Sequence, residues 1–199
     1  MQVAIILKSP DFFGEVQEDN VIYADAGYKH AEKIGKKNVL AVVGDFDSLG
    51  SAPAGQNIVQ LNVEKNFTDG ERAVRYASEC GATEIVIYGA YGGKIEHILG
   101  NITLLKIAKN LGLKACIKDG QTITELIDGK RVLSVKKGGT LSLIPYGDKC
   151  EFKSSKGLYY PLNNITLTHG DTRGISNVIQ SEQVTIEIES GETLVVYEK

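Results

Sequence analysis

The order of hydrophobic segments constrains the fold of this chain more than any other feature of its sequence. From Met1 to about Lys118, short runs of β-branched residues alternate with segments in which apolar residues recur every three or four positions. This alternation is typical of parallel strands connected by helices that cover the sheet. After Asp119 the helical spacing disappears, and short strand-like runs follow one another between Gly, Asp and Asn turns. The sequence therefore predicts an α/β domain at 1–120 and an antiparallel β domain at 121–199.

The first domain is expected to contain a mostly parallel sheet between layers of helices. Its predicted strands are Val3–Leu7, Val21–Ala24, Val39–Val43, Ile58–Leu61, Glu84–Tyr88 and Leu113–Ile117. Its predicted helices are Tyr28–Ile34, Asp69–Cys80 and Ile95–Leu111. One broad apolar face of the last helix contains Ile95, Ile98, Leu99, Ile102, Leu105, Ile107 and Ala108. Gly112 is expected to end that helix.

The second domain is expected to be an antiparallel β-sandwich or barrel. Its predicted strands are Thr122–Ile127, Arg131–Val135, Thr140–Ile144, Cys150–Lys153, Ile165–Thr168, Gln183–Glu189 and Thr193–Tyr197. Their near-regular spacing and the turn residues between them favour this architecture.

Composition narrows the classes of function. The 199 residues carry a formal net charge of −3, which gives no support to a nucleic-acid-binding surface. No apolar stretch approaches the length that spans a bilayer, and the run in MQVAIILKS is too short for a signal peptide, so a membrane role is not expected. Cys80, Cys116 and Cys150 lack CxxC spacing, which argues against a zinc site or a disulfide framework. Reduced thiols in a cytoplasmic protein are the expectation.

The clearest candidate site follows the third predicted strand, at Gly44-Asp45-Phe46-Asp47-Ser48. If the chain stays extended there, Asp45 and Asp47 face one spot while Phe46 turns toward the core. Two close carboxylates repel each other, and a hard cation such as magnesium or calcium relieves that repulsion. A polar turn at the end of the strand explains this stretch equally well when it is read alone.

Two further segments fall where a parallel sheet places its ligand crevice, beyond the carboxyl ends of the strands. Ala24-Asp25-Ala26-Gly27 offers a carboxylate beside a flexible residue, although helix N-capping by Asp25 is the simpler interpretation. In Glu64–Asp69, Lys65 can neutralise phosphate charge and Asp69 can supply a third carboxylate. Thr68 and Glu71 also predict a capping box, which is compatible with ligand binding.

The last candidate is the glycine-rich segment Tyr88–His97, which leads from a strand into the helix containing Asn101. A strand, a glycine turn and a helix start that carries Lys94 form a plausible phosphate cradle. The segment is not a Walker loop, because the GK[ST] ending is missing. His97 and Asn101 are four residues apart and share one helical face. A capping or surface role for His97 is the alternative.

Taken together, these motifs resemble the thiamine pyrophosphokinase family, and they occur in the same order from end to end. The motifs of this chain are ADAG at 24–27, GDFDS at 44–48, EKNFTD at 64–69, GGKIEHILGN at 92–101, GLYYPL at 157–162 and GISN at 174–177. The most specific of them are GDFDS and the TD pair at Thr68-Asp69.

The resemblance implies an ATP-binding catalytic domain at 1–120 and a β domain at 121–199 that contributes to thiamine binding and dimerisation. It further implies a cytoplasmic homodimer with active sites at the subunit interface. Asp45, Asp47 and Asp69 would hold Mg²⁺, and Lys65 would act with them in catalysis. The residues implied to bind ATP or thiamine are Asp25, Gly27, Ser48, Thr68, Gly93, Lys94, Glu96, His97, Asn101, Ser176 and Asn177.

Several positions depart from the family pattern. Asn66 and Glu96 stand where the family has Asp, Lys94 stands for Arg, and Tyr159 stands for Lys. The chain has no Trp, so stacking on thiamine must come from Tyr or Phe. Alternative functions are a pyrophosphokinase for another hydroxymethyl heterocycle, such as a pterin, and a non-catalytic regulator that binds thiamine or a nucleotide. A two-domain protein whose Gly-Asp turns are only structural fits each motif singly, but it fits poorly with all of them at one sheet edge.

Overall fold

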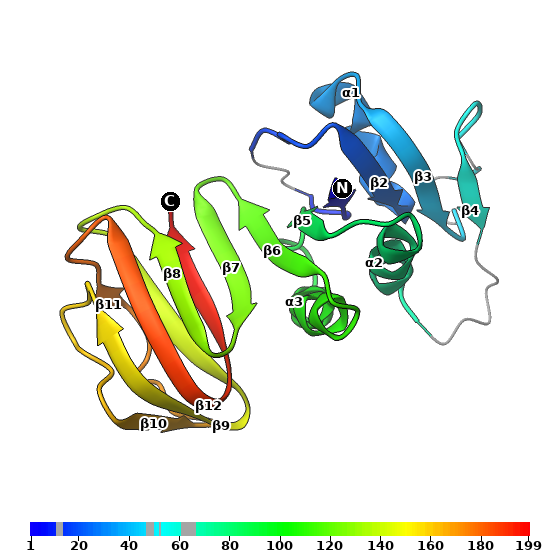
Figure 1. Ribbon diagram of the computed structural model, residues 1–199. Coiled ribbons are helices and arrows are strands. Elements are labelled where there is room, and N and C mark those ends of the chain that lie inside the picture. The colour runs from blue at the N-terminus through cyan, green and yellow to red at the C-terminus, as the bar shows by residue number, and fades with distance from the viewer. Residues whose placement is uncertain (11–13, 47–49, 52, 61–66) are drawn as a thin grey trace. The chain divides into compact units, whose positions relative to one another are not determined.

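The computed structural model describes residues 1–10, 14–46, 50–51, 53–60 and 67–199. The chain divides into two compact units, Met1–Gly120 and Gln121–Lys199. Figure 1 shows helices and parallel strands in the first unit and strands in the second. Among the helices of the described residues, none combines the length and the apolar character that crossing a membrane requires.

The first unit is built on a parallel sheet. Its strands are β1 (Gln2–Ile6), β2 (Asn20–Ala24), β3 (Asn38–Gly44), β4 (Ile58–Gln60), β5 (Glu84–Tyr88) and β6 (Lys114–Asp119). They lie in the order β6-β5-β1-β2-β3-β4, and every neighbouring pair is parallel. The chain therefore moves outward from β1 to β4 and then returns to the other side of β1 to form β5. Such a reversal places a ligand crevice at the carboxyl ends of β1 and β5.

Helical segments cover the sheet because successive strand residues point to opposite faces. On one face, Ala4 and Ile6 of β1 and Tyr23 of β2 form a core with Phe46, and residues of η1 (Asp25–His30) and α1 (Ala31–Ile34) pack against it. The longer helices α2 (Asp69–Glu79) and α3 (Ile95–Asn110) pack against each other. The α2 helix also packs on β1, β2 and β3, and α3 packs on β6. The predicted helix at 28–34 is thus a 3₁₀-helix followed by a short α-helix.

The apolar face predicted for α3 is buried only in the second half of the helix. Leu104, Leu105 and Ala108 are buried, whereas Ile95 is 72% exposed and Leu99 is 60% exposed. The helix is present as its spacing predicts, and within this unit its first two turns leave Ile95 and Leu99 exposed. Spacing identifies which residues share a face, and only the fold decides whether another element of the unit covers that face.

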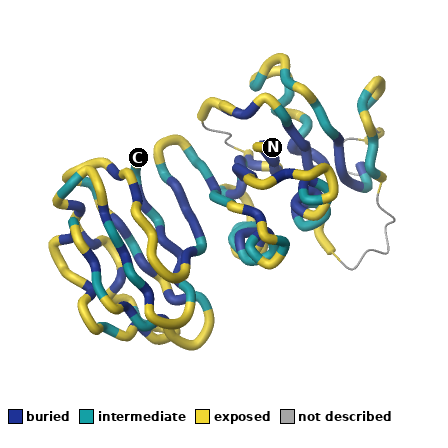
Figure 2. The backbone as a smooth tube through the Cα atoms, viewed as in Figure 1, coloured by how far each residue is buried: buried dark blue, intermediate teal, exposed yellow. Residues whose placement is uncertain are grey.

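The second unit is antiparallel throughout. Its strands are β7 (Thr122–Ile127), β8 (Lys130–Ser134), β9 (Thr140–Lys156), β10 (Ile165–Thr168), β11 (Asn177–Val178) and β12 (Gln183–Glu198). The long strand β12 pairs with β9, while β8 pairs with the first half of β12 and β7 with the second. β10 and β11 pair with β9. Figure 2 shows buried and exposed residues along these strands.

The two long strands correct the sequence prediction, which divided each of them in two. Residues 140–144 and 150–153 belong to β9, and residues 183–189 and 193–197 belong to β12. The Gly191 region reads as a turn in the sequence, but the pairing of β12 with β9 continues there with register shifts. Gly191 has φ +85°, and a Cβ at this position would meet the Lys149 carbonyl. A bulge therefore bends the strand where a turn was predicted. The short strand β11 was not predicted.

Candidate active site

Asp25 lies directly after β2, and its carboxylate is incompletely satisfied. The residue is 9% exposed, its φ is +42°, and its Oδ1 atom has no hydrogen-bond partner among the described residues. The N-cap position of η1 is occupied by Ala24, without a side-chain hydrogen bond, so the interpretation of Asp25 as an N-cap is wrong. A buried carboxylate oxygen without a donor is costly, which makes Asp25 available to a cation or a hydrogen-bond donor.

The end of β3 lies against Asp25. A Cβ on Gly44 would be 3.1 Å from both Cα and Cβ of Asp25, so only glycine fits without displacing that residue. Asp45 follows and is half-buried, while Phe46 is 5% exposed and joins the core as predicted. Asp47 and Ser48 lie outside the described residues.

The extended backbone assumed for this segment is not present. Phe46 has φ +64°, in the left-handed region that bulky residues rarely adopt. The extended backbone at Phe46, on which the prediction that Asp45 and Asp47 face one spot depended, is therefore absent, while Asp47 lies outside the described residues. The Phe46 side chain still packs in the core.

The start of α2 lies close to the end of β1. A Cβ on Gly70 would be 3.1 Å from Leu104 Cδ1 and 3.4 Å from Leu7 Cδ2. Asp69 is the first residue of the helix and is half-buried. Lys65 and Asn66 lie outside the described residues.

Thr68 caps α2 as predicted. Its Oγ1 accepts a hydrogen bond from the Glu71 backbone N–H at 3.2 Å. The Glu71 carboxylate does not complete a capping box in the expected way, because its Oε1 atom accepts from Nε and Nη2 of Arg75 at 2.9 and 2.8 Å. An i,i+4 ion pair along the helix replaces the reciprocal bond.

The glycine-rich loop, residues 89–93, follows β5 at the point where the strand order reverses. The Leu7 N–H donates to the Tyr88 carbonyl at 2.9 Å, which continues the pairing of β1 with β5 up to the loop. Gly89, Gly92 and Gly93 have φ values of +68°, +87° and +79°. The backbone N–H groups of a glycine turn can line an anion-binding concavity.

Side chains from both ends of this unit hold the loop carbonyls. Ser9 Oγ donates to the Tyr91 carbonyl at 2.7 Å, and Asn101 Nδ2 donates to the Ala90 carbonyl at 2.9 Å. The predicted phosphate ligand Asn101 therefore contacts the loop itself. The other predicted helix-start residues, Lys94, Glu96 and His97, are exposed where α3 begins.

Gly27 lies inside η1 with no room for a side chain, because a Cβ there would overlap the Ile6 carbonyl oxygen. Its role in the fold is thus to let η1 pack onto β1. This requirement does not depend on a ligand.

Sequence reasoning missed Ser9 and His30. Ser9 is 5% exposed, and its carbonyl oxygen lies 3.0 Å from His30 Nε2. Burial, followed in smaller measure by the nearby Lys33, lowers the pKa of His30, while the contact with Ser9 acts in the opposite direction. The signal was present, because Ser9-Pro10 follows β1 just as Asp25 follows β2.

The three-aspartate metal site remains a prediction. Within the described ranges, His, Cys, Asp and Glu form no group of three or more placed to hold a metal ion. Asp45 and Asp69 belong to those ranges, whereas Asp47 does not. The incompletely satisfied Asp25 carboxylate is the feature of this region that fits a cation.

In the second unit, Asn177 clamps the backbone of Tyr160. Its Nδ2 donates to the Tyr160 carbonyl at 2.7 Å, and its Oδ1 accepts from the Tyr160 N–H at 3.0 Å. Tyr160 and Tyr159 are 63% and 58% exposed and form an edge-to-face pair with ring centroids 4.8 Å apart. Ser176 is exposed with φ +58°, and its N–H donates to Ser142 Oγ at 3.0 Å. Ser176 and Asn177 thus adjoin an exposed aromatic surface.

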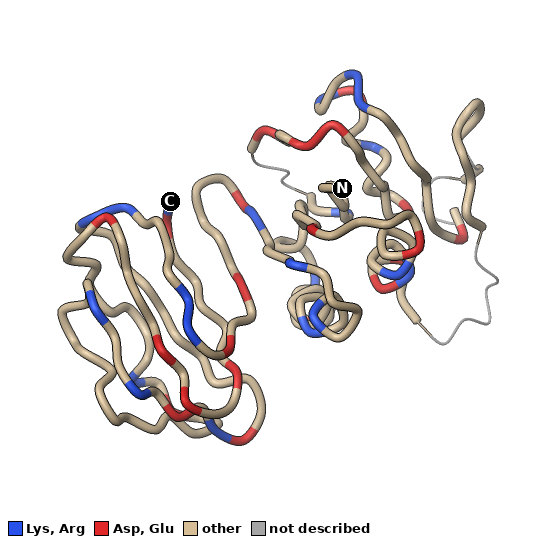
Figure 3. Tube along the Cα trace, in the orientation of Figure 1, with Lys and Arg blue, Asp and Glu red and all other residues tan. Residues whose placement is uncertain are grey.

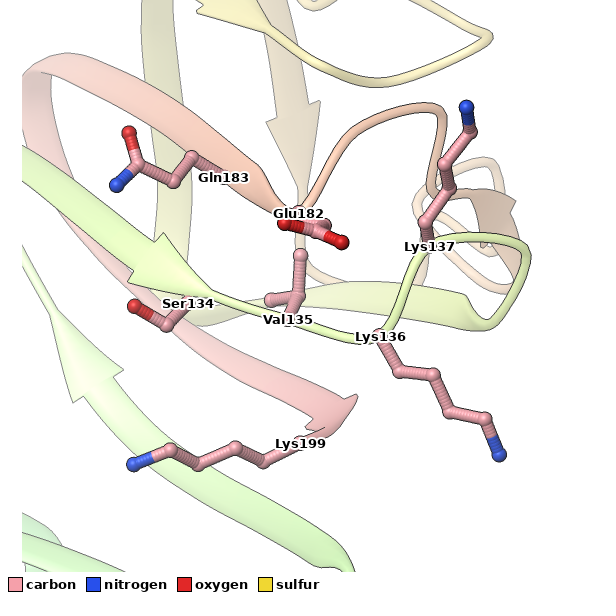
Figure 4. Close-up of a pocket in the computed structure, with 7 residues that line it drawn as sticks. All are labelled: Ser134, Val135, Lys136, Lys137, Glu182, Gln183 and Lys199. Carbon is pink, nitrogen blue, oxygen red and sulfur yellow. The ribbon is translucent and has the colours of Figure 1, made fainter.

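A separate hollow of about 610 Å³ lies in the second unit. It is lined by Ser134, Val135, Lys136, Lys137, Glu182, Gln183 and Lys199. Figure 4 shows the Lys136, Lys137 and Lys199 side chains pointing in different directions, so their ammonium groups do not converge on one ligand position. Figure 3 likewise shows both signs of charge interspersed in each unit. This hollow contains none of the predicted site residues.

Comparison with known proteins assigns the chain to a family. The model of the thiamin pyrophosphokinase catalytic domain matches residues 16–117, and the model of the vitamin B1 binding domain of that enzyme matches residues 128–193. The chain belongs to the thiamine pyrophosphokinase family. The thiamine pyrophosphokinase of Bacillus subtilis is 30% identical over 159 residues, which cover 74% of this chain and 73% of the relative. Thiamine pyrophosphokinase 1 of Oryza sativa is 24% identical, over 75% of this chain and 62% of its own length.

Solved structures of thiamine pyrophosphokinases share the fold. The Bacillus subtilis crystal structure superimposes with a TM-score of 0.87 at 24% identity, covering 100% of this chain and 99% of the other. The Candida albicans structure has a TM-score of 0.79 at 16% identity, covering 100% and 89%. The predicted fold class, family and enzyme class are confirmed.

Proposed function

We propose that this thiamine pyrophosphokinase transfers the pyrophosphoryl group of ATP to the hydroxyl of thiamine, giving thiamine diphosphate and AMP. The observation that supports this most directly is the incompletely satisfied carboxylate of Asp25, which touches the end of β3 in a unit that matches the catalytic domain. A magnesium-bound triphosphate is held through carboxylates such as those that follow β2 and β3 and begin α2, whereas thiamine, which is itself a cation, needs no metal ion. This argues against a regulator that binds thiamine alone.

The ATP phosphates would bind the glycine-rich loop and the helix starts. The left-handed glycines of the loop favour anion binding through backbone N–H groups, and the beginnings of α2 and α3 add the positive ends of helix dipoles. Lys94 is exposed at the start of α3 and would offset phosphate charge, together with Lys65. Thr68, Ser48, Gly93 and His97 are the remaining proposed phosphate contacts.

Magnesium would be held by Asp45, Asp47 and Asp69, and Asp25 would join them or bind a metal-bound water. Asp25 fits this role because its Oδ1 atom is buried without a partner among the described residues. A bound magnesium ion supplies charge neutralisation across the phosphates. Asp25, which is buried, and Glu96, which is exposed, remain the candidates for accepting the thiamine hydroxyl proton.

The reaction follows an in-line displacement. The thiamine hydroxyl oxygen forms a bond to the β-phosphorus, and the bond from that phosphorus to the α,β-bridging oxygen breaks. AMP leaves with the bonding electron pair, and the hydroxyl proton passes to a carboxylate. Because the transition state has little covalent participation from the protein, the role of these residues is to position the phosphates and stabilise their charge.

Thiamine would be bound by Ser176 and by the exposed Tyr159–Tyr160 pair, which Asn177 holds in place. An aromatic face attracts the positively charged thiazolium ring. The protein is proposed to be a cytoplasmic homodimer. The exposed Ile95 and Leu99 of α3 support the homodimer, because they offer apolar surface for a second copy. The formal charge of −3 gives no reason to expect a nucleic-acid partner.

The decisive experiment incubates the purified protein with ATP, Mg²⁺ and thiamine and separates the nucleotides. AMP and thiamine diphosphate should appear in equal amounts. A parallel reaction with a hydroxymethyl pterin tests the alternative acceptor and should give no AMP above background. Production of ADP, or turnover of the pterin alone, would overturn the proposal.

A further inference from the structure

Two consecutive carbonyl groups of the glycine-rich loop accept hydrogen bonds from side chains outside the loop. Ser9 donates to the Tyr91 carbonyl and Asn101 donates to the Ala90 carbonyl, at 2.7 and 2.9 Å. Ser9 is 82 residues away from its partner and follows β1, whereas Asn101 lies in the second turn of α3. The loop is therefore held from the strand beside it and from the helix after it.

Holding a carbonyl also fixes the direction of an N–H group. In a planar trans peptide the C=O of one residue and the N–H of the next point in opposite directions. The bond from Ser9 thus turns the Gly92 N–H away from Ser9, and the bond from Asn101 turns the Tyr91 N–H away from Asn101. Each side chain therefore bonds the carbonyl side of a peptide group and leaves the N–H on the opposite side available to another partner.

Gly92 of the loop packs closely against the Ser9-Pro10 segment. A Cβ on Gly92 would lie 3.1 Å from Ser9 Oγ and 3.1 Å from Pro10 Cδ. The carbonyl oxygen of Ser9 also lies 3.0 Å from Nε2 of His30. His30 belongs to η1, the segment that begins with Asp25. Ser9 therefore connects the glycine-rich loop to η1, which carries the buried Asp25 carboxylate.

We propose that Ser9 is a positioning residue for the transfer reaction, which orients the glycine-rich loop so that its backbone N–H groups bind the ATP phosphates. Asn101 performs the same task from α3 and is not itself a phosphate ligand. This proposal rests on the proposed function, because it assumes that the loop binds phosphate. Thiamine, which we propose binds at Ser176 and the Tyr159–Tyr160 pair, should bind independently of Ser9.

The test replaces Ser9 by Ala and measures ATP binding in the presence of Mg²⁺ by calorimetry, separately from turnover. Ser9→Ala keeps the size of the side chain and removes the hydroxyl. We expect the dissociation constant for ATP to rise five- to tenfold, the KM for thiamine to stay within twofold, and the melting temperature to stay close to that of the wild type. Asn101→Ala should show the same split between the two substrates.

The matched control is Thr103→Val, which removes another hydroxyl that donates to a backbone carbonyl, that of Gly100 at 2.6 Å, on the exposed side of α3. This variant should bind ATP like the wild type. Unchanged ATP binding in Ser9→Ala, or an equal loss for both substrates together with a lower melting temperature, would overturn the positioning role. If the wild type and variants differ in ATP binding as expected but the wild type makes no thiamine diphosphate, the proposed function fails while the positioning role stands.

Discussion

The Asp25 side chain of the first unit and the Asn177 side chain of the second are both buried, and each lies in a segment that contains a non-glycine residue with positive φ. They differ in what they contact. Both polar atoms of the Asn177 side chain bond to the backbone of Tyr160, whereas Asp25 Oδ1 has no partner within the described part of the chain. Among the described residues, the hydrogen bonding of the Asn177 side chain is therefore complete, and that of the Asp25 side chain is not.

Some carboxylates of the second unit are also paired. In the second unit, Glu125 accepts from Tyr197 and pairs with Arg131, and Glu187 pairs with Lys153. In the first unit, Phe46 is held in the left-handed region at a cost of about 1–3 kcal/mol. This backbone strain at the end of β3, and the Asp25 carboxylate oxygen that has no partner among the described residues at the end of β2, favour a ligand in this region. In the second unit, the Asn177 side chain holds the backbone of the exposed Tyr160 with both of its polar atoms.

The largest expected effect comes from Asp45→Asn, which tests whether the end of β3 carries charge for the reaction. The substitution keeps the shape of the side chain and removes a proposed magnesium ligand. We expect kcat to fall by about a hundredfold or more, because electrostatic stabilisation of the phosphates is lost, with little change in melting temperature. Asp148→Asn, on an exposed part of β9, is the control and should retain full activity. Full activity of Asp45→Asn would remove Asp45 from the metal site.

Asp25→Asn tests whether the incompletely hydrogen-bonded carboxylate serves the reaction or the fold. Asn tolerates positive φ as well as Asp does, and it removes a charge that has an unsatisfied oxygen. We expect activity to fall about tenfold or more while the free energy of unfolding rises by about 1 kcal/mol. Steady-state kinetics and urea unfolding measure the two quantities. A variant that is both less stable and fully active would show that Asp25 serves the fold.

Asn177→Ala should have the opposite signature. It removes two hydrogen bonds to Tyr160, so the free energy of unfolding should fall by about 2 kcal/mol. The KM for thiamine should rise, and the KM for ATP should not change. Asn110→Ala, at the exposed end of α3, controls for the loss of an amide elsewhere. A rise in the KM for ATP alone would contradict the assignment of this segment to thiamine.

The smallest expected effect is the pH dependence of stability that His30 of the first unit contributes. Burial lowers the pKa of His30 below its ordinary value of 6.5, so the unfolded chain binds a proton more readily than the folded one. Stability should therefore decline as the pH falls below about 6.5. His30→Gln should decline less over the same range, as measured by urea unfolding at pH 7 and pH 5. Identical slopes for the two proteins would exclude His30 as the source.

Local patterns predicted the elements that depend on neighbouring residues. β5 spans 84–88, β7 spans 122–127 and β10 spans 165–168, as expected from their runs of apolar and β-branched residues. The cap of α2 by Thr68 was also predicted, because donor and acceptor are three residues apart. The long strands β9 and β12 were not, because whether a Gly-containing segment turns or bulges depends on the strand that pairs with it.

The sequence placed the candidate residues Asp25, Asp45 and Asn101 after the correct strands or on the correct helix, but it did not reveal their contacts. The local interpretation of Asp25 as a cap is wrong, because Ala24 occupies the N-cap position. The role of Asn101 at ATP stays a prediction, and its Nδ2 donates to a loop carbonyl. A side chain has several possible partners within reach, and the one it bonds depends on backbone directions that the sequence does not reveal.

The sequence by itself determined the alternation of strands and helices, the change to an antiparallel domain, and the motifs that identify a thiamine pyrophosphokinase. These properties depend on the periodicity and order of residues along the chain. Only the tertiary structure decided that Ser9 holds a loop 82 residues away, that Asn177 supports Tyr160, and that Asp25 Oδ1 finds no partner in the described part of the chain. Those outcomes depend on which backbone groups the packed strands bring within about 3 Å of a side chain.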